Sequence, residues 1–372
     1  MNWLLAPDSF KGCMSALGVA HAMARGIRRA DVNAKCTVLP MADGGEGTLD
    51  VLHAAREGEW RTFDVIDAES RIRSVSCLFL PKGVAVIEVA RVIGLPDVSD
   101  SLIDERSSEG VGQLIRACLD AGAKRIVVAL GGSSTNDGGA GCLRALGVRL
   151  LDVDERELSG CPSELARLQR IDIDSLDSRL SSIRIDIWSD VDSPLLGVRG
   201  ASRLFSRQKG ASEQDVLTLE AALLRFSLLA DRAWRKKISM RPGSGAAGGL
   251  GYALQLIGGR MKSGAAAVSR LCNLSKAMAR ADWVVTGEGR SDDQTLGGKV
   301  PDEVRRLARE AGVPVTLICG ALFPTPELLS AFDGCYSICP RPMTLTQSIE
   351  EAEALIEGVC EQLARTILAA SR

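Results

Sequence analysis

Hydrophobic positions along the chain follow two periodicities in turn, one typical of helices and one typical of strands. Apolar residues recur at helical spacing between residues 17 and 27, and Ser15 precedes them as a predicted N-cap. In the segment 183–187, isoleucines instead alternate with charged residues, which is the periodicity of a half-buried strand. Alternation of the two patterns predicts an α/β protein.

The order of these elements predicts two kinds of sheet. Strands and helices alternate in the first and last thirds, which favours parallel sheets. In the middle, two strands joined by the turn Pro81-Lys82-Gly83 favour an antiparallel element. Ser212 with Asp215 resembles a capping box before a helix that continues through Trp234. Strands are expected at 3–6, 36–39, 74–80, 84–90, 125–130, 183–187, 283–286, 315–318 and 335–338, and further helices at 107–121, at 301–311 and from Ile349 onward.

Length and charge narrow the class of protein. A chain of 372 residues is too long for one compact core, so two domains are expected. Lys and Arg total 45 against 47 Asp and Glu, which argues against a nucleic-acid partner because such proteins need a basic surplus. No apolar run approaches the roughly 20 residues of a membrane-spanning helix. The first residues lack the basic region of a signal peptide, so a cytoplasmic protein is expected.

Cysteine and histidine usage limits the available chemistry. The eleven cysteines are dispersed, contain no C-x-x-C pair and are expected to be reduced and mostly buried. With only His21 and His53, a histidine-based zinc site or a Ser-His-Asp hydrolase is not expected. Catalysis would therefore depend on carboxylates, Lys, Arg, hydroxyls and backbone amides.

Glycines gather where the predicted strands end. The chain has 38 of them, and the densest clusters lie at 42–48, 131–141, 242–251 and 287–294. Ligands of open α/β sheets bind at the carboxyl ends of strands, where glycine lets backbone amides approach phosphate closely. One such cluster alone is more often a structural turn. Four together, three of them with carboxylates, favour a polyanion site with a metal.

The common nucleotide fingerprints do not account for these clusters. Residues 243–248 satisfy G-x-G-x-x-G, but no good strand precedes them, and no acidic residue occurs between Arg235 and Asp282 to hold a ribose. A Walker A motif is absent, because Gly298-Lys299 is followed by Val300. The H-R-D and D-F-G motifs of protein kinases are absent too.

Six segments in fixed order resemble the bacterial glycerate kinase family. Any one of them is weakly specific, whereas the ordered set is highly specific and extends from about residue 3 to the last predicted strand. The segments are APDSFKG (6–12), PMADGGEGT (40–48), GGSSTNDGGAG (131–141), QKGA (208–211), GEGR (287–290) and GKVP (298–301).

This resemblance implies an ATP-dependent enzyme that uses a divalent metal, taken as Mg²⁺, and phosphorylates D-glycerate, usually at the 2-hydroxyl. It implies two α/β domains, a Rossmann-like parallel-sheet domain with a second, mixed-sheet domain inserted into it. We expect the first at 1–58 and 265–372 and the second at 59–264, although 105–145 fits either. Glycerate and ATP are the expected partners, with no nucleic acid and no membrane; a homo-oligomer is left open.

Phosphoryl transfer needs positioning and charge neutralisation, and candidate residues follow from that. Asp190, after the strand 183–187, is a candidate base or metal ligand, unless it is only a turn residue. The candidate catalytic residues are Asp190, Lys11, Arg290 and Asp292, and the candidate substrate-binding residues are Asp8, Ser9, Asp43 and Lys299. The candidate phosphate-binding residues are Gly131, Gly132, Ser133, Thr135, Asn136, Asp137, Gly287 and Glu288, and the candidate metal ligands are Asp292 and Glu288.

Each assignment has a simpler alternative. Arg290 between Glu288 and Asp292 is either a clamp for phosphate or carboxylate or a salt-bridged turn, and Lys11 or Lys299 could be an ordinary solvated lysine. Arg91 departs from the family pattern and leaves substrate choice open. The remaining alternatives are a kinase for another small sugar acid on the same scaffold and a non-catalytic nucleotide or polyanion sensor.

Overall fold

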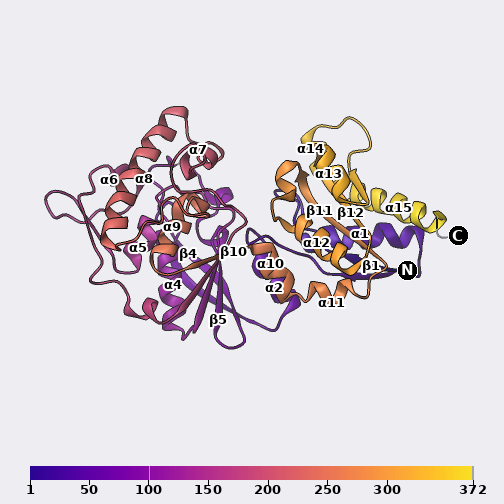
Figure 1. The fold of residues 1–372 in the computed structure, drawn as a ribbon, viewed down its shortest axis with the longest axis horizontal. Coiled ribbons are helices and arrows are strands. Elements are labelled where there is room, and N and C mark those ends of the chain that lie inside the picture. The colour runs from indigo at the N-terminus through magenta and orange to yellow at the C-terminus, as the bar shows by residue number, and fades with distance from the viewer. Residues whose placement is uncertain (100, 371–372) are drawn as a thin grey trace. The chain divides into compact units, whose positions relative to one another are not determined.

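The computed structural model describes residues 1–99 and 101–370. Its contacts divide the chain into two compact units, whose elements are labelled in Figure 1. Unit 1 consists of residues 1–43, 50–56 and 263–372, and unit 2 of residues 44–49 and 57–262. Unit 2 therefore lies almost entirely between two segments of unit 1 along the chain.

Unit 1 is built on a five-stranded sheet in which all neighbouring strands are parallel. Its order is β13 (Gly334–Ser337), β12 (Val315–Leu322), β11 (Trp283–Ser291), β1 (Asn2–Leu5) and β2 (Lys35–Val38). Chain order reverses between β1 and β11, since β2 lies on one side of β1 and the later strands on the other. Open α/β sheets bind ligands at the carboxyl ends of strands at such a switch point.

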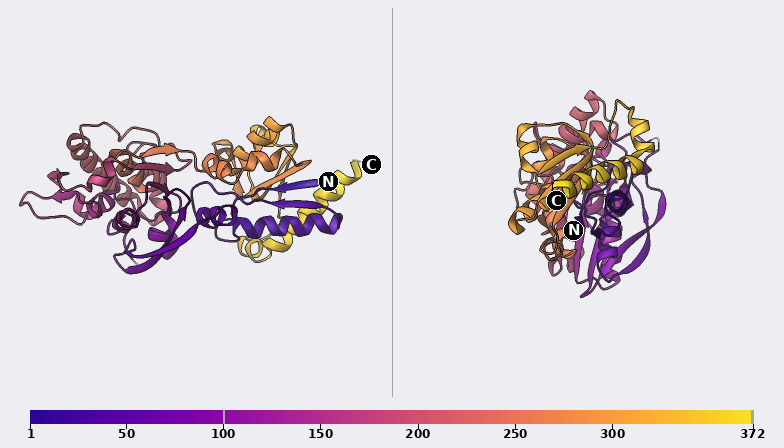
Figure 2. Two further views of the ribbon diagram at one scale, coloured as in Figure 1. Left: turned by 90° about the horizontal axis from the view of Figure 1, so that it is seen from below. Right: turned by 90° about the vertical axis from the view of Figure 1, so that its right-hand side faces the viewer.

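Helices cover this sheet on both sides. Figure 2 shows α1 (Ala16–Ala30) beside α15 (Ala352–Ala370), with α12 (Val300–Ala311) on the opposite side of the sheet. Gly26 lets α1 and α15 approach closely, because a Cβ there would lie 2.2 Å from the Glu357 carbonyl oxygen. The other helical segments are α2 (Thr48–Ala55), α10 (Gly264–Leu271), α11 (Leu274–Met278), η5 (Asp293–Leu296), α13 (Pro326–Ala331) and α14 (Leu345–Glu350).

Unit 2 contains a mixed sheet of six strands. Its order is β10 (Arg260–Lys262), β9 (Arg184–Trp188), β6 (Arg125–Ala129), β5 (Val84–Glu88), β4 (Ile72–Leu80) and β3 (Glu59–Ile66). The strands from β10 to β5 are parallel to one another, whereas β4 is antiparallel to both β5 and β3. A separate antiparallel pair joins β7 (Arg149–Leu151) to β8 (Arg170–Asp172).

The helices of unit 2 pack around a large apolar core. Phe226 of α8 and Tyr252 of α9 meet edge to face in it, with ring centroids 6.0 Å apart. The Tyr252 hydroxyl donates to Asp231 Oδ1 at 2.8 Å, so its buried polar end has a partner. The helical segments are α3 (Ala90–Ile93), η1 (Leu95–Asp97), α4 (Glu109–Asp120), α5 (Ala140–Ala145), α6 (Pro162–Leu165), η2 (Ser178–Ser181), α7 (Ala201–Phe205), η3 (Arg207–Lys209), α8 (Glu213–Ala233), η4 (Ala246–Gly249) and α9 (Leu250–Leu256).

The predicted fold class, α/β with one parallel and one mixed sheet, is confirmed. Ser15 caps α1, and Ser212 and Asp215 form the predicted capping box of α8. The expected terminal helix is two helices, because Glu351 ends α14 before α15 begins. β11 is longer than expected, because its glycine-rich second half stays extended along β12. Across the described residues, no helix is both long and apolar enough to cross a membrane.

Candidate functional site

The predicted site residues fall into two groups, one in each unit. In unit 1, Asp8 follows β1 at the switch point of the sheet. Its backbone N–H donates to the Gly287 carbonyl at 2.8 Å, which fixes it against β11. The carboxylate is buried, and its Oδ1 accepts a 2.7 Å hydrogen bond from the Ser9 amide. The Ser9 hydroxyl is buried without a hydrogen-bond partner in the described part of the chain.

Charges of both signs surround Asp8. Burial, together with the nearby carboxylate of Asp43, raises the pKa of Asp8 well above its usual value of 3.8. Lys11 Nζ lies 3.5 Å from Asp43 Oδ2, and chiefly this carboxylate raises the pKa of the lysine. A carboxyl group held against ionisation beside an unused hydroxyl is typical of a ligand site rather than of a structural ion pair.

Glu288 lies on β11 beside this cluster. Its Oε1 accepts hydrogen bonds from Thr295 Oγ1 at 2.6 Å and Ser291 Oγ at 3.1 Å, and burial raises its pKa. The neighbouring Gly289 permits close passage of the loop after β1, because a Cβ there would lie 3.3 Å from Phe10 Cα. Lys299 immediately precedes α12, and its positive charge opposes part of this rise in the pKa of Glu288.

Arg290 and Asp292 form the salt-bridged turn that the sequence left open. Arg290 Nε lies 3.1 Å from Asp292 Oδ2, and the guanidinium stacks on Phe323 at 4.4 Å from the ring centroid. Asp292 also caps η5, where its Oδ1 accepts from the Gln294 amide at 3.0 Å. The Arg290 side chain remains 66% exposed, so its outer nitrogens are accessible to a ligand.

A divalent metal was expected at Glu288 and Asp292. Among residues 1–99 and 101–370, no group of three or more His, Cys, Asp or Glu side chains gathers to hold a metal. Mg²⁺ is usually held by only one or two carboxylates together with substrate phosphates and water. Glu288 and Asp292 are two carboxylates, four residues apart on β11 and the following turn. This number suits a metal that binds together with nucleotide phosphates better than one held by the protein alone.

In unit 2, the predicted phosphate residues form the loop between β6 and α5. Gly131 lets the loop pass over Gly45, because a Cβ at Gly131 would lie 2.4 Å from the Gly45 Cα. Gly248 is equally tight, because a Cβ there would lie 2.0 Å from the Thr135 carbonyl oxygen. Gly132 has φ +81°, a conformation that favours glycine.

This loop, residues 131–136, which we call the glycine loop, carries hydrogen-bond donors without acceptors. Within the described residues, the amides of Gly132, Ser133, Thr135 and Asn136 donate to no protein acceptor. The Thr135 hydroxyl is buried and unpartnered as well, whereas Asn136 Oδ1, also unpartnered, can only accept a hydrogen bond. Ser133, Thr135 and Asn136 are buried, and buried polar groups are normally paired, so their unused donors indicate a binding site for an acceptor-rich anion.

Asp137 follows the glycine loop, but its carboxylate is fully occupied within the protein. Oδ2 accepts from the amide and hydroxyl of Ser108 at 2.8 and 2.7 Å and from the Gly141 amide at 3.3 Å. Oδ1 accepts from the Gly139 amide at 3.0 Å. The structure therefore places Asp137 as the residue that anchors the loop to the start of α4.

Sequence reasoning missed two cationic residues beside the glycine loop. The Lys209 side chain is buried against it, and Arg106 donates from Nη1 to the Lys209 carbonyl at 2.8 Å. Lys209 appeared in the sequence only as part of the segment QKGA, which carried the family resemblance but assigned the lysine no role. Arg106 gave no motif signal, because it lies in an irregular segment before α4.

Asp190 lies in unit 2, two residues after β9 ends at Trp188. It is half-buried, whereas its neighbour Asp192 is 76% exposed and pairs with Arg199 at 3.1 Å. The end of β9 also lies close to the first glycine cluster, residues 42–48, because a Cβ at Gly44 would be 3.0 Å from the Trp188 carbonyl oxygen.

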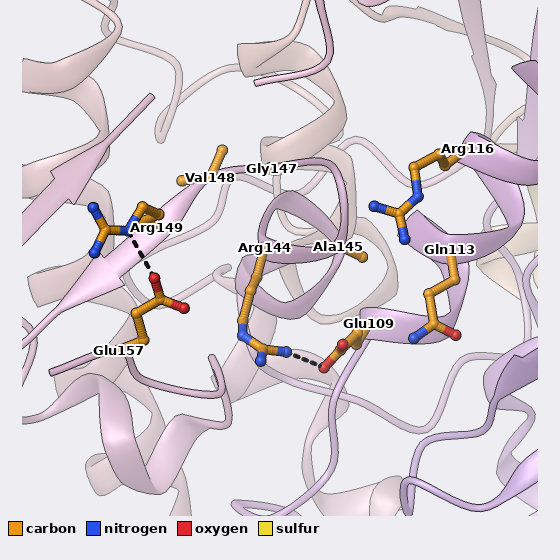
Figure 3. Close-up of a pocket in the computed structure, with 9 residues that line it drawn as sticks. All are labelled: Glu109, Gln113, Arg116, Arg144, Ala145, Gly147, Val148, Arg149 and Glu157. Carbon is orange, nitrogen blue, oxygen red and sulfur yellow. Dashed lines mark hydrogen bonds and ion pairs between the residues drawn. The ribbon is translucent and has the colours of Figure 1, made fainter. Parts of the chain in front are cut away.

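A shallow hollow of about 290 Å³ in unit 2 contains none of the predicted residues (Figure 3). Its walls come from α4, the end of α5 and the β7 region. Arg144 pairs there with Glu109 at 2.6 Å, and Arg149 with Glu157 at 2.7 Å. Since the carboxylates already neutralise two of its arginines, this hollow gives no sign of the predicted chemistry.

Proteins of one family match this chain over nearly its whole length. The sequence profile described as the glycerate kinase family matches residues 3–368. Glycerate 2-kinase of Escherichia coli K12 is 36% identical over 373 residues, covering 99% of this chain and 98% of that protein. Glycerate kinase of Bacillus subtilis 168 is 37% identical over 378 residues, covering 99% and 98%.

A solved structure extends the similarity to the fold. The crystal structure assigned as glycerate kinase 2 of Salmonella typhimurium LT2 has a TM-score of 0.83 and 36% identity, and it covers 100% of this chain and 99% of that chain. Both the profile and these relatives extend over essentially the whole sequence. The chain belongs to the glycerate kinase family.

Proposed function

We propose that this protein is an ATP-dependent kinase that phosphorylates D-glycerate at its 2-hydroxyl, giving 2-phosphoglycerate and ADP. The relatives named glycerate kinase support the reaction, and the name glycerate 2-kinase supports the choice of hydroxyl. The structural observation that carries the proposal is the buried Asp8 carboxyl, which lies beside an unpartnered Ser9 hydroxyl at the switch point.

Glycerate is assigned to the unit 1 group. Its hydroxyls would hydrogen-bond to Asp8, Ser9 and Asp43, whose short side chains lie after β1 and β2. Its carboxylate needs a cation, and Lys299 with Arg290 can supply one. The 66% exposure of Arg290 fits a side chain that meets an anion bidentately from solvent.

The phosphates of ATP are assigned to the glycine loop, which offers unused backbone amides at Gly132, Ser133, Thr135 and Asn136. Gly131 shapes this loop and Asp137 anchors it. Glu288 and Asp292, with Gly287 giving close backbone approach, are assigned to Mg²⁺. That metal, when bound, neutralises charge on the phosphate oxygens.

The chemical step needs one proton acceptor. The glycerate 2-oxygen forms a bond to the γ-phosphorus while the bond from that phosphorus to the oxygen of ADP breaks. The hydroxyl proton passes to the Asp190 carboxylate and then to water. Lys11 and Arg290 balance the negative charge that develops on the transferred group.

Three broader features belong to the same proposal. We assign one domain to residues 1–58 and 265–372 and the other to residues 59–264. The division of the chain's contacts near residues 56 and 263 supports this assignment. A cytoplasmic location suits an enzyme that uses ATP. A homo-oligomer is compatible with the fold.

A substrate panel tests the function. ADP release would be measured with MgATP and D-glycerate, L-glycerate, glycolate, lactate or tartronate at equal concentration. D-glycerate should give the highest kcat/KM. Faster turnover of another acid would identify a different sugar-acid kinase on this scaffold, whereas nucleotide binding without any ADP would identify a sensor.

A further inference from the structure

Lys209 is a buried lysine whose ammonium nitrogen contacts two uncharged oxygen atoms. Its side chain is 4% exposed, and Nζ donates to the Thr135 carbonyl at 2.7 Å and to Ser133 Oγ at 3.1 Å. In the described part of the chain, no carboxylate oxygen lies within 4.0 Å of this nitrogen. Both of its acceptors are uncharged atoms of the glycine loop.

Such a position disfavours the ammonium ion. Burial, with a further contribution from the positive charge of Arg106, lowers the pKa of Lys209 to about 7, although Asp137 opposes the shift. These are the charged groups that face it, from the loop and from the segment before α4. Ser206, which follows α7, contributes its carbonyl, which accepts from the Lys209 amide at 2.9 Å.

An anion on the glycine loop would reverse this balance. The unused amides of Ser133, Thr135 and Asn136 and the free Thr135 hydroxyl surround the same stretch of backbone that Nζ contacts. A phosphate held by these donors would bring negative charge close to Nζ. An opposite charge at short range favours the protonated lysine.

We propose that Lys209 binds the phosphate chain of the nucleotide as an ammonium ion, so that nucleotide binding takes up a proton at this residue. The inference rests on the proposed function for the identity of the anion. It adds a residue and a pH dependence to the glycine loop that neither the sequence motif nor the relatives' names assign.

Proton uptake is measured directly by titration calorimetry of the full chain with MgADP at pH 8.0, in two buffers of different ionisation enthalpy. The nucleotide phosphates are fully ionised there, since their last pKa is about 6. Because the pKa of Lys209 is about 7, it is mostly neutral before binding, and uptake should approach roughly 0.9 proton per nucleotide. The Kd for MgADP should weaken by roughly tenfold per pH unit above pH 7.5.

Two substitutions isolate the residue. Lys209→Met has nearly the same length and removes a buried charge, so uptake should vanish and Kd should lose its dependence on pH. Lys236→Met is the matched control, because Lys236 also donates to a backbone carbonyl, that of Leu256 at 2.6 Å, and burial lowers its pKa too. It lies away from the glycine loop, so uptake in this variant should equal that of the unaltered protein.

The outcomes separate the inference from the proposed function. Binding of MgADP without proton uptake in the unaltered protein, or uptake that persists in Lys209→Met, would overturn the inference even if glycerate is phosphorylated. Uptake that depends on Lys209 in a chain that does not phosphorylate glycerate would instead overturn the proposed function. The first of these measurements needs no variant, so it stands even if Lys209→Met fails to fold.

Discussion

The two groups of site residues differ in charge and in hydrogen-bonding character. The unit 1 group brings together carboxylates, Asp8, Asp43 and Glu288, and raises the pKa of two of them by burial. The glycine loop of unit 2 has no carboxylate free to meet a ligand, because Asp137 is occupied by four donors. It offers instead unused amides and a buried lysine.

This difference assigns a ligand chemistry to each group. Carboxyl groups exchange hydrogen bonds with the hydroxyls of a ligand, and ionised carboxylates can also bind a metal. A set of N–H donors beside a cation instead binds phosphate. A hydroxy acid and a nucleotide need these two chemistries. Substitutions in the unit 1 group should therefore change KM for glycerate, and substitutions at the glycine loop should change KM for ATP. Equal effects on both substrates would contradict the assignment.

The largest effect is expected at Asp190. If it accepts the hydroxyl proton, Asp190→Asn should lower kcat by about 10² to 10⁴-fold while KM for glycerate and the Mg²⁺ requirement stay near their original values. Steady-state kinetics over a magnesium series checks this. Asp192→Asn is the control, because that residue is exposed and forms a surface ion pair of little energetic weight.

Two results would change the role of Asp190. If Asp190→Asn keeps more than about a tenth of kcat at saturating magnesium, the loss is smaller than a general base contributes, and Asp190 is not the base. A requirement for higher magnesium, with partial recovery in excess metal, would make it a metal ligand instead.

A smaller, two-sided effect is expected at Asp8. At pH 8, where we expect the Asp8 carboxyl to be ionised, Asp8→Asn removes a charge-assisted hydrogen bond worth about 1.5–3 kcal/mol, so KM for glycerate should rise roughly 10- to 100-fold while KM for ATP changes little. Because burial raises the pKa of Asp8 in the folded state, ionisation costs stability as pH rises through that pKa. The variant should therefore melt at a higher temperature than the unaltered protein at pH 8, and the difference should shrink toward pH 4.

Thermal melts across pH and separate KM measurements check both sides. A rise in KM for ATP equal to that for glycerate would erase the distinction between the two groups. If Asp8→Asn melts at a lower temperature than the unaltered protein at pH 8, the ionised Asp8 carboxylate stabilises the fold, which contradicts this account.

A still smaller effect separates loop shape from backbone strain. Gly248 and Gly258 both have positive φ, at +65° and +95°, but only a Cβ at Gly248 would meet the glycine loop. Gly248→Ala should cost about 1–3 kcal/mol more than Gly258→Ala because the Thr135 carbonyl must move. Its KM for ATP should rise several-fold, with KM for glycerate unchanged. Equal melting temperatures for the two variants would contradict this reading of the loop.

The smallest effect is expected at Cys13, near the unit 1 group. Its thiol donates to the Ile349 carbonyl at 3.6 Å, and burial raises its pKa, so it is a poor nucleophile at neutral pH. Cys13→Ser should keep turnover within a few-fold. A loss of about 10³ or more, the scale on which nucleophiles matter, would make the thiol catalytic.

Much of the fold was readable from the sequence because its signals are local. The capping residues Ser15 and Ser212 and the hairpin turn at Pro81 mark element ends through chemistry that acts within a few residues. Strands β3, β7, β8 and β10 were missed. β3 lies at the edge of its sheet, with its residues mostly half-exposed, and the other three have only three residues each, so none of the four has a strong apolar pattern.

The site was only partly readable, because long-range packing decides what a side chain does. Asp137 and Thr135 lie two residues apart in one motif, yet one is fully hydrogen-bonded within the protein and the other is left with a free hydroxyl. Lys209 lies 74 residues from the carbonyl it contacts. No spacing rule connects such positions, and only the folded structure shows that they meet.

Transfer of phosphate to the 2-hydroxyl of D-glycerate can be measured in one coupled assay. Enolase accepts 2-phosphoglycerate but not the 3-isomer, so the protein would be incubated with MgATP, D-glycerate and enolase, with and without phosphoglycerate mutase. We expect phosphoenolpyruvate to form with enolase alone, at a rate that the mutase does not increase. A strict requirement for the mutase would contradict phosphorylation at the 2-hydroxyl, and the absence of both ADP and phosphoenolpyruvate would contradict the function itself.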